Sequence, residues 1–282
     1  MASSQAESRM SGRIAARLRI AMPAVFAWRA PVRRIAMPAI TAVVILALWE
    51  AIVRLAGVPK FVLPPPSDVL RSFASDVGSV AMWTNLGITT TETILGFAFG
   101  SLLGVTLGVL IAEFPVIDEA VYPLIVAFQA MPKVAIAPLL LLWFGFGIGS
   151  KVAIAALLAF FPLLVNTVLG LHASDTQQEE LMHSLAANRW QIFVMVRLRN
   201  ALPSIFAGLE LAMVFSVIGA IVGEFVGARG GLGYMIQQRN ANIDVAGILS
   251  VLLILGIVGA VLTYGVKAVA AKVVFWNHRA QR

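Results

Sequence analysis

The stretch EELMHSLAANRWQIFVMVRLRNALPSIFAGLE, residues 179–210, interrupts a strongly apolar chain with a polar, arginine-bearing segment that leads directly into another apolar run. This polar part is too hydrophilic to cross a membrane, but its apolar residues recur with the spacing of a surface helix or a pair of short helices. Asp175 or Thr176 is suited to cap the first turn, and Pro203 to open the next membrane helix. We predict that residues 173–203 form a polar helical loop between two membrane helices. The apolar residues of this loop include Leu181, Leu185, Trp190, Phe193, Val194 and Val196.

Composition places the chain in a membrane. Of its 282 residues, 60% are hydrophobic and 12% are charged, and the mean hydropathy is +0.90. So much apolar surface exceeds what a single soluble core of this size can bury. Several apolar runs approach the twenty residues that a helix needs to cross a bilayer. We therefore predict an all-α, polytopic membrane protein.

The residues that usually carry chemistry are scarce. The sequence contains no cysteine, which excludes disulfides, thiolate catalysis and cysteine metal ligands, and its three histidines lack a metal-binding spacing. It has no GxxxxGK[ST] phosphate loop and no serine or deaminase catalytic pattern. We expect no catalytic residue, cofactor or metal in this chain. Basic membrane flanks explain the net charge of +7, so we do not expect nucleic acid as a partner.

The apolar runs predict six transmembrane helices. The expected spans are 36–57, 84–112, 119–134, 150–171, 204–227 and 245–271. An additional apolar stretch, 134–149, contains Pro138, and we interpret it as a bent or partly re-entrant continuation of the third span. A complete extra span there would move everything after it to the other side of the membrane.

Charge predicts the orientation. The segment 1–34 carries seven arginines against one acid, and the loop 173–203 and the C-terminal end are also basic. Basic flanks favour the cytoplasmic side, and all three fall there when six spans are counted. We expect a basic cytoplasmic arm over 1–34, a permease domain over 35–276 and a cytoplasmic tail over 277–282. The arm lies along the anionic membrane surface or forms a disordered tail.

The loops 58–83 and 228–244 then face outward. Three prolines before Ser67 and Asp68 predict a short surface helix in the first of them, with one of these two residues as its cap. Arg229 and Arg239 in the second loop attract an anion or meet acidic residues of a binding protein.

A few residues inside the spans carry further expectations. Gly96, Gly100, Gly104 and Gly108 share one helical stripe, which favours close packing within the subunit over a gating contact. Glu50 and Arg54 stand one turn apart, and we expect a local ion pair. Glu224 lies where the fifth span reaches the outer face. It orients a substrate or holds a gate, or else it only accepts hydrogen bonds from the glycine-rich loop behind it.

The polar loop resembles the "EAA" loop of permease subunits of bacterial binding-protein-dependent ABC importers. Glu180 matches the acidic residue of that pattern and Leu202-Pro203 its closing pair. The match is incomplete, because Leu181 and Met182 replace two alanines. In addition, Ala186 stands at the glycine position, where it is small enough to keep a close approach, and Arg199 stands where many relatives have proline.

The resemblance extends over about 60–270. Within these permeases, the chain is similar to the nitrate/sulfonate/taurine group (NitT/TauT). The matching segments are LPPPSDVL (63–70), AMPKVAIAPLLLLWFGFG (130–147), FFPLLVNTVLGL (160–171) and GEFVGARGGLGYMI (223–236). It implies the type I importer permease fold, also called MetI-like, in a bacterial inner (plasma) membrane.

The resemblance also implies partners. These are two cytoplasmic ABC ATPase subunits that bind ATP and Mg, a second permease copy in a homodimer, an extracytoplasmic or lipid-anchored substrate-binding protein, and the surrounding lipid. In such permeases the loop docks on the ATPase. Its residues here would be Glu180, Leu181, His183, Ser184, Leu185, Ala186, Ala187, Asn188 and Arg189. The candidate residues of the pathway or gate are Glu224, Met131 and Pro132.

The solute is less sharply indicated. The segment VIGAIVGEFVGARGGLGY is more similar to permeases for pyrimidines and riboflavin-like or aromatic compounds. The other solutes carried by this group are nitrate, sulfonates and taurine. The alternative is a secondary transporter or channel that needs no ATPase. Such proteins usually show an internal repeat or a polar midplane site, and no repeat is apparent in this sequence.

Overall fold

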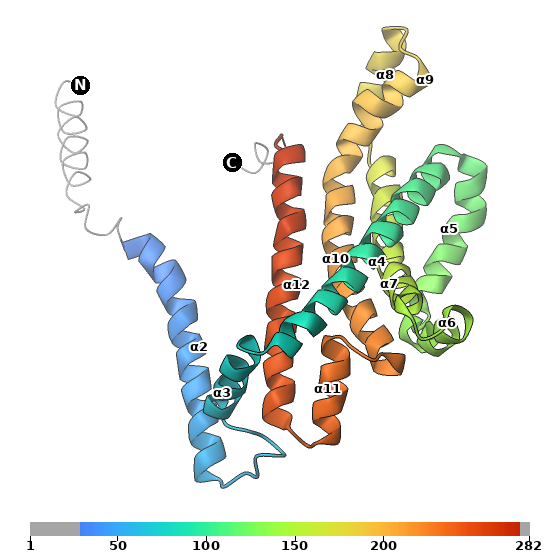
Figure 1. Ribbon diagram of the computed structural model, residues 1–282. Helices are drawn as coiled ribbons and strands as arrows, with labels where there is room; N and C mark the ends of the chain where they lie inside the picture. Colours follow the sequence, from blue (N-terminus) through green and yellow to red (C-terminus); the bar gives the residue numbers. More distant parts are fainter. Residues whose placement is uncertain (1–28, 277–282) are drawn as a thin grey trace, which may run out of the picture. The chain divides into compact units, whose positions relative to one another are not determined.

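The structure is a computed structural model that describes residues 29–276 (Figure 1). The predicted tail 277–282 and most of the predicted arm 1–34 lie outside the described residues. The chain divides into two compact units, 1–58 and 59–282, and each is described by itself.

The described part of the first unit is essentially one helix, α2, Arg29–Leu55. It contains the first predicted span. The expected local ion pair is confirmed, because Arg54 Nε lies 2.5 Å from Glu50 Oε1.

The regular elements of the second unit are all helices over its described residues. Its elements are α3 (Pro66–Val77), α4 (Val80–Glu113), α5 (Pro115–Ala130), η2 (Lys133–Ile136), α6 (Ala137–Phe144), α7 (Ile148–His172), α8 (Thr176–Ser184), α9 (Arg189–Ile192), the π-helical turn η3 (Phe193–Arg197), α10 (Leu198–Gly227), α11 (Leu232–Ala241) and α12 (Val245–Val273).

Across the described residues, five helices are long and apolar enough to cross a membrane. A sixth candidate is the pair Pro115–Ala130 and Lys133–Phe144, which is bent by 88°. By length and composition this agrees with six spans and with a bent continuation of the third. The break lies just before the stretch 134–149, and Pro138 is not its cause. Pro138 lies in the first turn of α6, where its missing N–H costs no helical hydrogen bond, and the helix breaks instead at Met131 and Pro132.

Two predicted helix starts were also wrong. Helix α3 begins at Pro66 with Pro65 as its N-cap, so neither Ser67 nor Asp68 caps it. Helix α10 begins at Leu198, and Pro203 lies inside it. Proline is common in the first turn, but here the backbone enters α10 already helical from the π turn, so proline does not mark the start.

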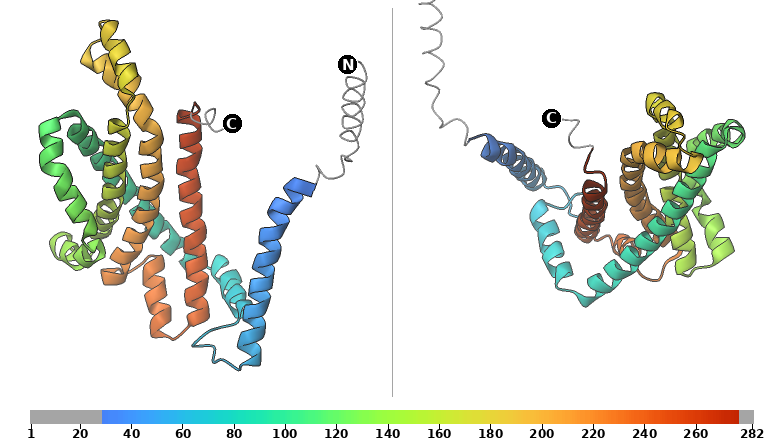
Figure 2. Two further views of the ribbon diagram at one scale, coloured as in Figure 1. Left: turned by 180° about the vertical axis from the view of Figure 1, so that it is seen from behind. Right: turned by 90° about the horizontal axis from the view of Figure 1, so that it is seen from above.

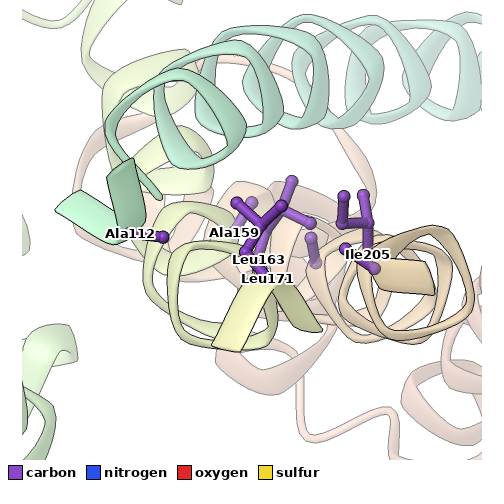
Figure 3. Packing of buried hydrophobic residues seen from close by; sticks show 7 residues of the cluster. Ala112, Ala159, Leu163, Leu171 and Ile205 are labelled. Carbon is purple, nitrogen blue, oxygen red and sulfur yellow. The ribbon is translucent and has the colours of Figure 1, made fainter. Parts of the chain in front are cut away.

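Helices α4, α7 and α10 pack together at the centre of the second unit, and the views in Figure 2 agree that they lie side by side. Their shared cluster contains Ala112 of α4, Leu163 of α7 and Ile205 of α10. Figure 3 shows these side chains gathered where the three helices meet.

The glycine stripe of α4 permits this packing. A Cβ added at Gly100 would lie 2.6 Å from the carbonyl oxygen of Ala156, and one at Gly108 would lie 2.7 Å from Cβ of Thr167. Both neighbours belong to α7. The prediction of close packing within the subunit is confirmed, and the partner helix is α7.

Candidate functional site

The predicted polar loop forms two short helices at one end of the unit, which we call the loop end (Figure 1). Helix α8 begins after Asp175, whose side chain accepts a hydrogen bond of 3.0 Å from the Gln177 N–H. This satisfies one of the N–H groups that a helix start leaves free. The capping prediction is confirmed for Asp175.

Helix α8 ends in a Schellman motif. The Ala187 N–H donates to the Met182 carbonyl and the Ala186 N–H to the His183 carbonyl, each at 3.0 Å. The motif requires a left-handed residue, and Ala186 has φ 57°. Glycine adopts this conformation without strain. The glycine position of the EAA pattern therefore corresponds here to a backbone requirement. That the small side chain of Ala186 also permits a close approach stays a prediction.

The second short helix is fixed by a capping box. The Asn188 side chain accepts from the Gln191 N–H, and the Gln191 side chain accepts from the Asn188 N–H, both at 2.8 Å. The ring of Trp190 lies 5.6 Å from that of Phe193. Local hydrogen bonds thus determine the course of the loop between α8 and α9.

The loop exposes apolar side chains. Leu181 is 60% exposed, and Leu185 and Trp190 are each 70% exposed. Glu180 is also exposed, and within the described part of the chain no ion pair or side-chain hydrogen bond is seen for it. We call Glu180, Leu181, Leu185 and Trp190 the loop face. Leucine and tryptophan are costly to leave in water, so this face has the composition of a contact surface.

Arg197 connects the loop to the end of α4. Its Nη1 lies 2.6 Å from Glu113 Oε1, its Nη2 donates to the Ala112 carbonyl at 3.4 Å, and its Nε lies 3.7 Å from Glu179 Oε1 of α8. Arg197 belongs to the π turn, and π turns are frequent at functional sites. The sequence analysis counted Arg197 only as a basic flank.

Arg199, which departs from the EAA pattern, also has a contact. Its guanidinium lies 5.0 Å from the ring centre of Trp276, beyond the end of α12. A cation over an indole face is favourable at a partly exposed site. The substitution for proline thus adds a contact between the start of α10 and the residues after α12.

Glu224 lies at the opposite end of the unit, which we call the α11 end (Figure 1). It is 0% exposed and accepts hydrogen bonds from Thr89 Oγ1 at 2.6 Å and from the Gly233 N–H at 2.5 Å. Thr89 in turn accepts from the Leu232 N–H at 2.8 Å. The interpretation that Glu224 receives hydrogen bonds from the glycine-rich loop is confirmed. A pathway or gate role for it stays a prediction.

Two further ionisable residues lie close enough to Glu224 for their charges to interact with it. They are Glu92 and Lys151, each 3% exposed. Lys151 Nζ donates to the carbonyls of Phe146, Gly147 and Gly227, at 2.5, 3.0 and 3.1 Å. Buried charges need such partners because transfer out of water is costly. The sequence analysis did not consider Lys151 as a buried charge.

A second polar cluster at the α11 end joins the surface helix α3 to α11 and α12. Arg239 donates from Nη1 to Asp76 Oδ2 at 2.8 Å and to the Gly247 carbonyl at 2.6 Å, and the Ser250 hydroxyl also donates to Asp76. Hydrogen bonding to Asp76 raises the pKa of Arg239 above its usual value. The expectation that Arg239 attracts an anion or a partner is therefore replaced by an internal ion pair.

A pocket of about 470 Å³ lies beside the bend after α5. Its lining comes from the end of α5, η2, α7 and α10, and includes Gln129, Met131, Lys133, Phe161, Asn166 and Phe215. Of the predicted pathway residues, Met131 lines this pocket and Pro132 is its chain neighbour. Glu224 is not among the lining residues.

These features define a polytopic helical protein with an exposed loop between its fourth and fifth candidate spans. Residues 100–274 match the family model described as "Binding-protein-dependent transport system inner membrane component". The chain belongs to this family and is the permease subunit of an ABC importer.

Relatives support this assignment across most of the chain. The chain is 34% identical to the formylaminopyrimidine transport permease protein of Halalkalibacterium halodurans, covering 86% of this chain and 96% of that protein. It is 36% identical to the riboflavin transport system permease protein of Chloroflexus aurantiacus, covering 73% and 76%. It is 26% identical to the taurine transport system permease protein of Escherichia coli, covering 90% and 94%.

Solved structures agree on the fold. The chain is similar to a chain of the MetNI methionine ABC transporter in an inward-facing conformation, with a TM-score of 0.60. The match covers 68% of this chain and 96% of that chain at 20% identity. The predicted MetI-like fold is confirmed.

Proposed function

We propose that the loop face is the surface through which an ABC ATPase drives this permease. The loop end then faces the cytoplasm, where it meets one of two ATPase subunits that bind ATP and Mg. The coupling residues are those of the segment 180–189, together with Trp190.

The observation that carries this proposal is an exposed apolar face on a loop with fixed geometry. A hydrogen-bonded cap, a Schellman motif and a capping box define α8 and α9, so the loop face does not have to become ordered before a partner binds. Preorganised surfaces with exposed leucine and tryptophan are typical of protein contacts, because little conformational entropy is lost on binding.

Arg197 provides a route from the loop to the membrane helices. Movement of α8 acts on Glu179, and Arg197 connects Glu179 to Glu113 at the end of α4. Helix α4 packs on α7 through its glycine stripe, so a displacement of α4 is transmitted to the core. ATP-driven closure of the ATPase pair would move the loops of two permease copies together and switch the opening of the path between them.

The remaining partners follow from this orientation. A substrate-binding protein delivers solute at the α11 end, which faces outward, and a second copy of this chain completes a homodimer in the bacterial inner membrane. Both chain termini are cytoplasmic.

The solute is an organic compound of the pyrimidine, riboflavin-like or aromatic kind, since the relatives named for formylaminopyrimidine and riboflavin transport are 34% and 36% identical to this chain. Sulfonates and taurine are the second candidates.

The test is solute uptake by cells carrying the Glu180→Arg variant. We expect ATP-dependent uptake to be abolished while the protein remains in the membrane, because a reversed charge on the loop face repels the ATPase surface that accepts Glu180. Glu119→Arg is the matched control, an exposed acidic residue on α5 outside the proposed contact. Unchanged uptake by Glu180→Arg would defeat the assignment, and uptake driven by a proton or sodium gradient would favour a secondary transporter.

A further inference from the structure

The pocket beside the bend after α5 carries both polar and aromatic groups. Its volume of about 470 Å³ falls within the range of sites for small organic molecules. A nitrate or bicarbonate ion would fill only a small part of it. The size therefore favours a solute with an apolar or ring-shaped body.

Lys133 is the charged residue of the lining. Its Nζ donates to the Gln129 carbonyl at 3.1 Å and lies 4.8 Å from the ring centre of Phe161. An ammonium group has three N–H donors, so two are left beyond the contact with Gln129. Lys133 thus offers hydrogen bonds and positive charge at the aromatic wall of the pocket.

The α7 side of the pocket offers acceptors. Asn166 donates from Nδ2 to the Pro162 carbonyl at 2.7 Å, and among the described residues no donor to its amide oxygen is seen. Pro162 lies inside α7 and has no N–H, so it cannot donate to the carbonyl of Leu158, four residues earlier. Asn166, Pro162 and Leu158 all line the pocket.

The apolar part of the lining includes Phe161 of α7 and Phe215 of α10. Flat rings pack against phenyl groups in offset or edge-to-face arrangements. A cationic donor, two acceptors and two phenyl rings together match a flat heterocycle that bears both N–H and C=O groups. A simple alkanesulfonate carries only acceptors and would leave the α7 acceptors unmatched. Taurine has an ammonium donor for them, but it has no ring to pack against the phenyl groups.

We propose that this pocket is the solute site of the permease and that it takes a nitrogen heterocycle of pyrimidine or flavin type, bound by Lys133 and by the α7 acceptors. The inference rests on the proposed function, because it names the solute that the importer moves. In this proposal Met131, which follows α5 and lines the pocket, contacts the solute.

The test uses the absence of cysteine from the chain. Full-length protein with Val134→Cys, in nanodiscs together with its ATPase, is labelled with a maleimide in the presence and absence of riboflavin or a formylaminopyrimidine. Val134 lines the pocket and is half exposed. At ten times its Kd, a bound heterocycle should slow labelling about tenfold. The matched control is Leu253→Cys on α12, similarly exposed and outside the pocket, where no protection is expected.

Adding Lys133→Met to Val134→Cys should raise the concentration needed for protection by about 10- to 100-fold, the usual effect of losing a charged hydrogen bond. Lys272→Met, at the end of α12, should leave it unchanged. Failure of both heterocycles to protect residue 134, or protection by taurine alone, overturns the proposal. Failure of the ATPase to co-purify is a separate result that overturns the proposed function, since labelling is read on the permease itself.

Discussion

The two ends of the second unit satisfy their polar and apolar groups in different ways. At the α11 end, Glu224 is fully buried and bonded to Thr89 and the Gly233 N–H, and the Asp76–Arg239 pair joins three helices. At the loop end, Leu185 and Trp190 are mostly exposed, and Arg197 is the described ion-pair link from α8 to α4. The named polar groups at the α11 end are paired within the chain, whereas the loop end leaves leucine and tryptophan side chains exposed.

This difference separates substitutions that are expected to affect folding from those expected to affect assembly with another protein. A buried hydrogen-bonded carboxylate leaves unsatisfied donors when it is removed, so its loss destabilises the fold. An exposed leucine on a capped loop makes few internal contacts, so its loss changes binding and leaves stability nearly unchanged. The predictions below compare the two ends, from the largest expected effect to the smallest.

Glu224→Ala should cause the largest loss of stability, about 2–5 kcal/mol, because it leaves the buried Gly233 N–H without its acceptor and removes the buried hydrogen bond from Thr89. Thermal unfolding of the purified protein measures the change. Glu224→Gln keeps one acceptor oxygen and should lose less, with transport retained. Normal stability but no transport in Glu224→Gln would indicate a direct role in the pathway.

Gly100→Val should be the next most harmful change, at about 1–3 kcal/mol or more, because the added side chain meets the Ala156 backbone of α7. Gly259→Val on α12 is the control, since a Cβ there meets nothing within 4 Å. Yield and thermal stability of the two variants should differ clearly. Equal stability would show that α4 and α7 do not pack as described.

Arg197→Met should loosen the loop by about 1–3 kcal/mol, because Glu113 and Glu179 lose their common cation. Hydrogen exchange of the α8 amides should become faster while that of the α11 end stays the same. Arg199→Met, which loses only the contact with Trp276, is the control. Unchanged α8 exchange in Arg197→Met would remove the proposed route from the loop to α4.

Ala186→Gly should have the smallest effect, a stabilisation of at most about 1 kcal/mol. Glycine relieves the left-handed strain at φ 57°, and its greater unfolded-state entropy offsets part of the gain. Ala187→Gly, one residue later and outside the left-handed position, should instead destabilise slightly. Thermal unfolding of both variants is the measurement, and a reversed order would contradict the Schellman geometry.

Much of this fold was predictable because lipid restricts the chain to a few solutions. Long apolar runs in a membrane must form helices, so the six expected spans agree with the five long helices and the bent pair. The glycine stripe likewise predicted close packing, since four glycines on one face have few other uses. The Asp175 cap followed from local hydrogen bonding alone.

The remaining features depend on distant contacts or on backbone geometry that a sequence does not display. The position of the break at Met131 and Pro132 was not given by the sequence analysis. Pro203 suggested a helix start, but α10 runs through it because the preceding π turn is already helical. The pairing of Arg239 with Asp76 joins residues 163 positions apart. Lys133 and Lys151 gave a usable signal, because each is a lysine within or beside a long apolar run.

The most direct test of the account is co-purification of the ATPase with the tagged chain, comparing the wild type with Leu185→Asp on the loop face and Leu253→Asp on α12, where the leucine is also exposed. We predict that the wild type brings down a Walker-motif ATPase and that Leu185→Asp loses it while keeping its thermal stability. Leu253→Asp, if it inserts, should keep the ATPase. An ATPase that stays bound to Leu185→Asp at the wild-type level would contradict the claim that the loop face is the coupling surface.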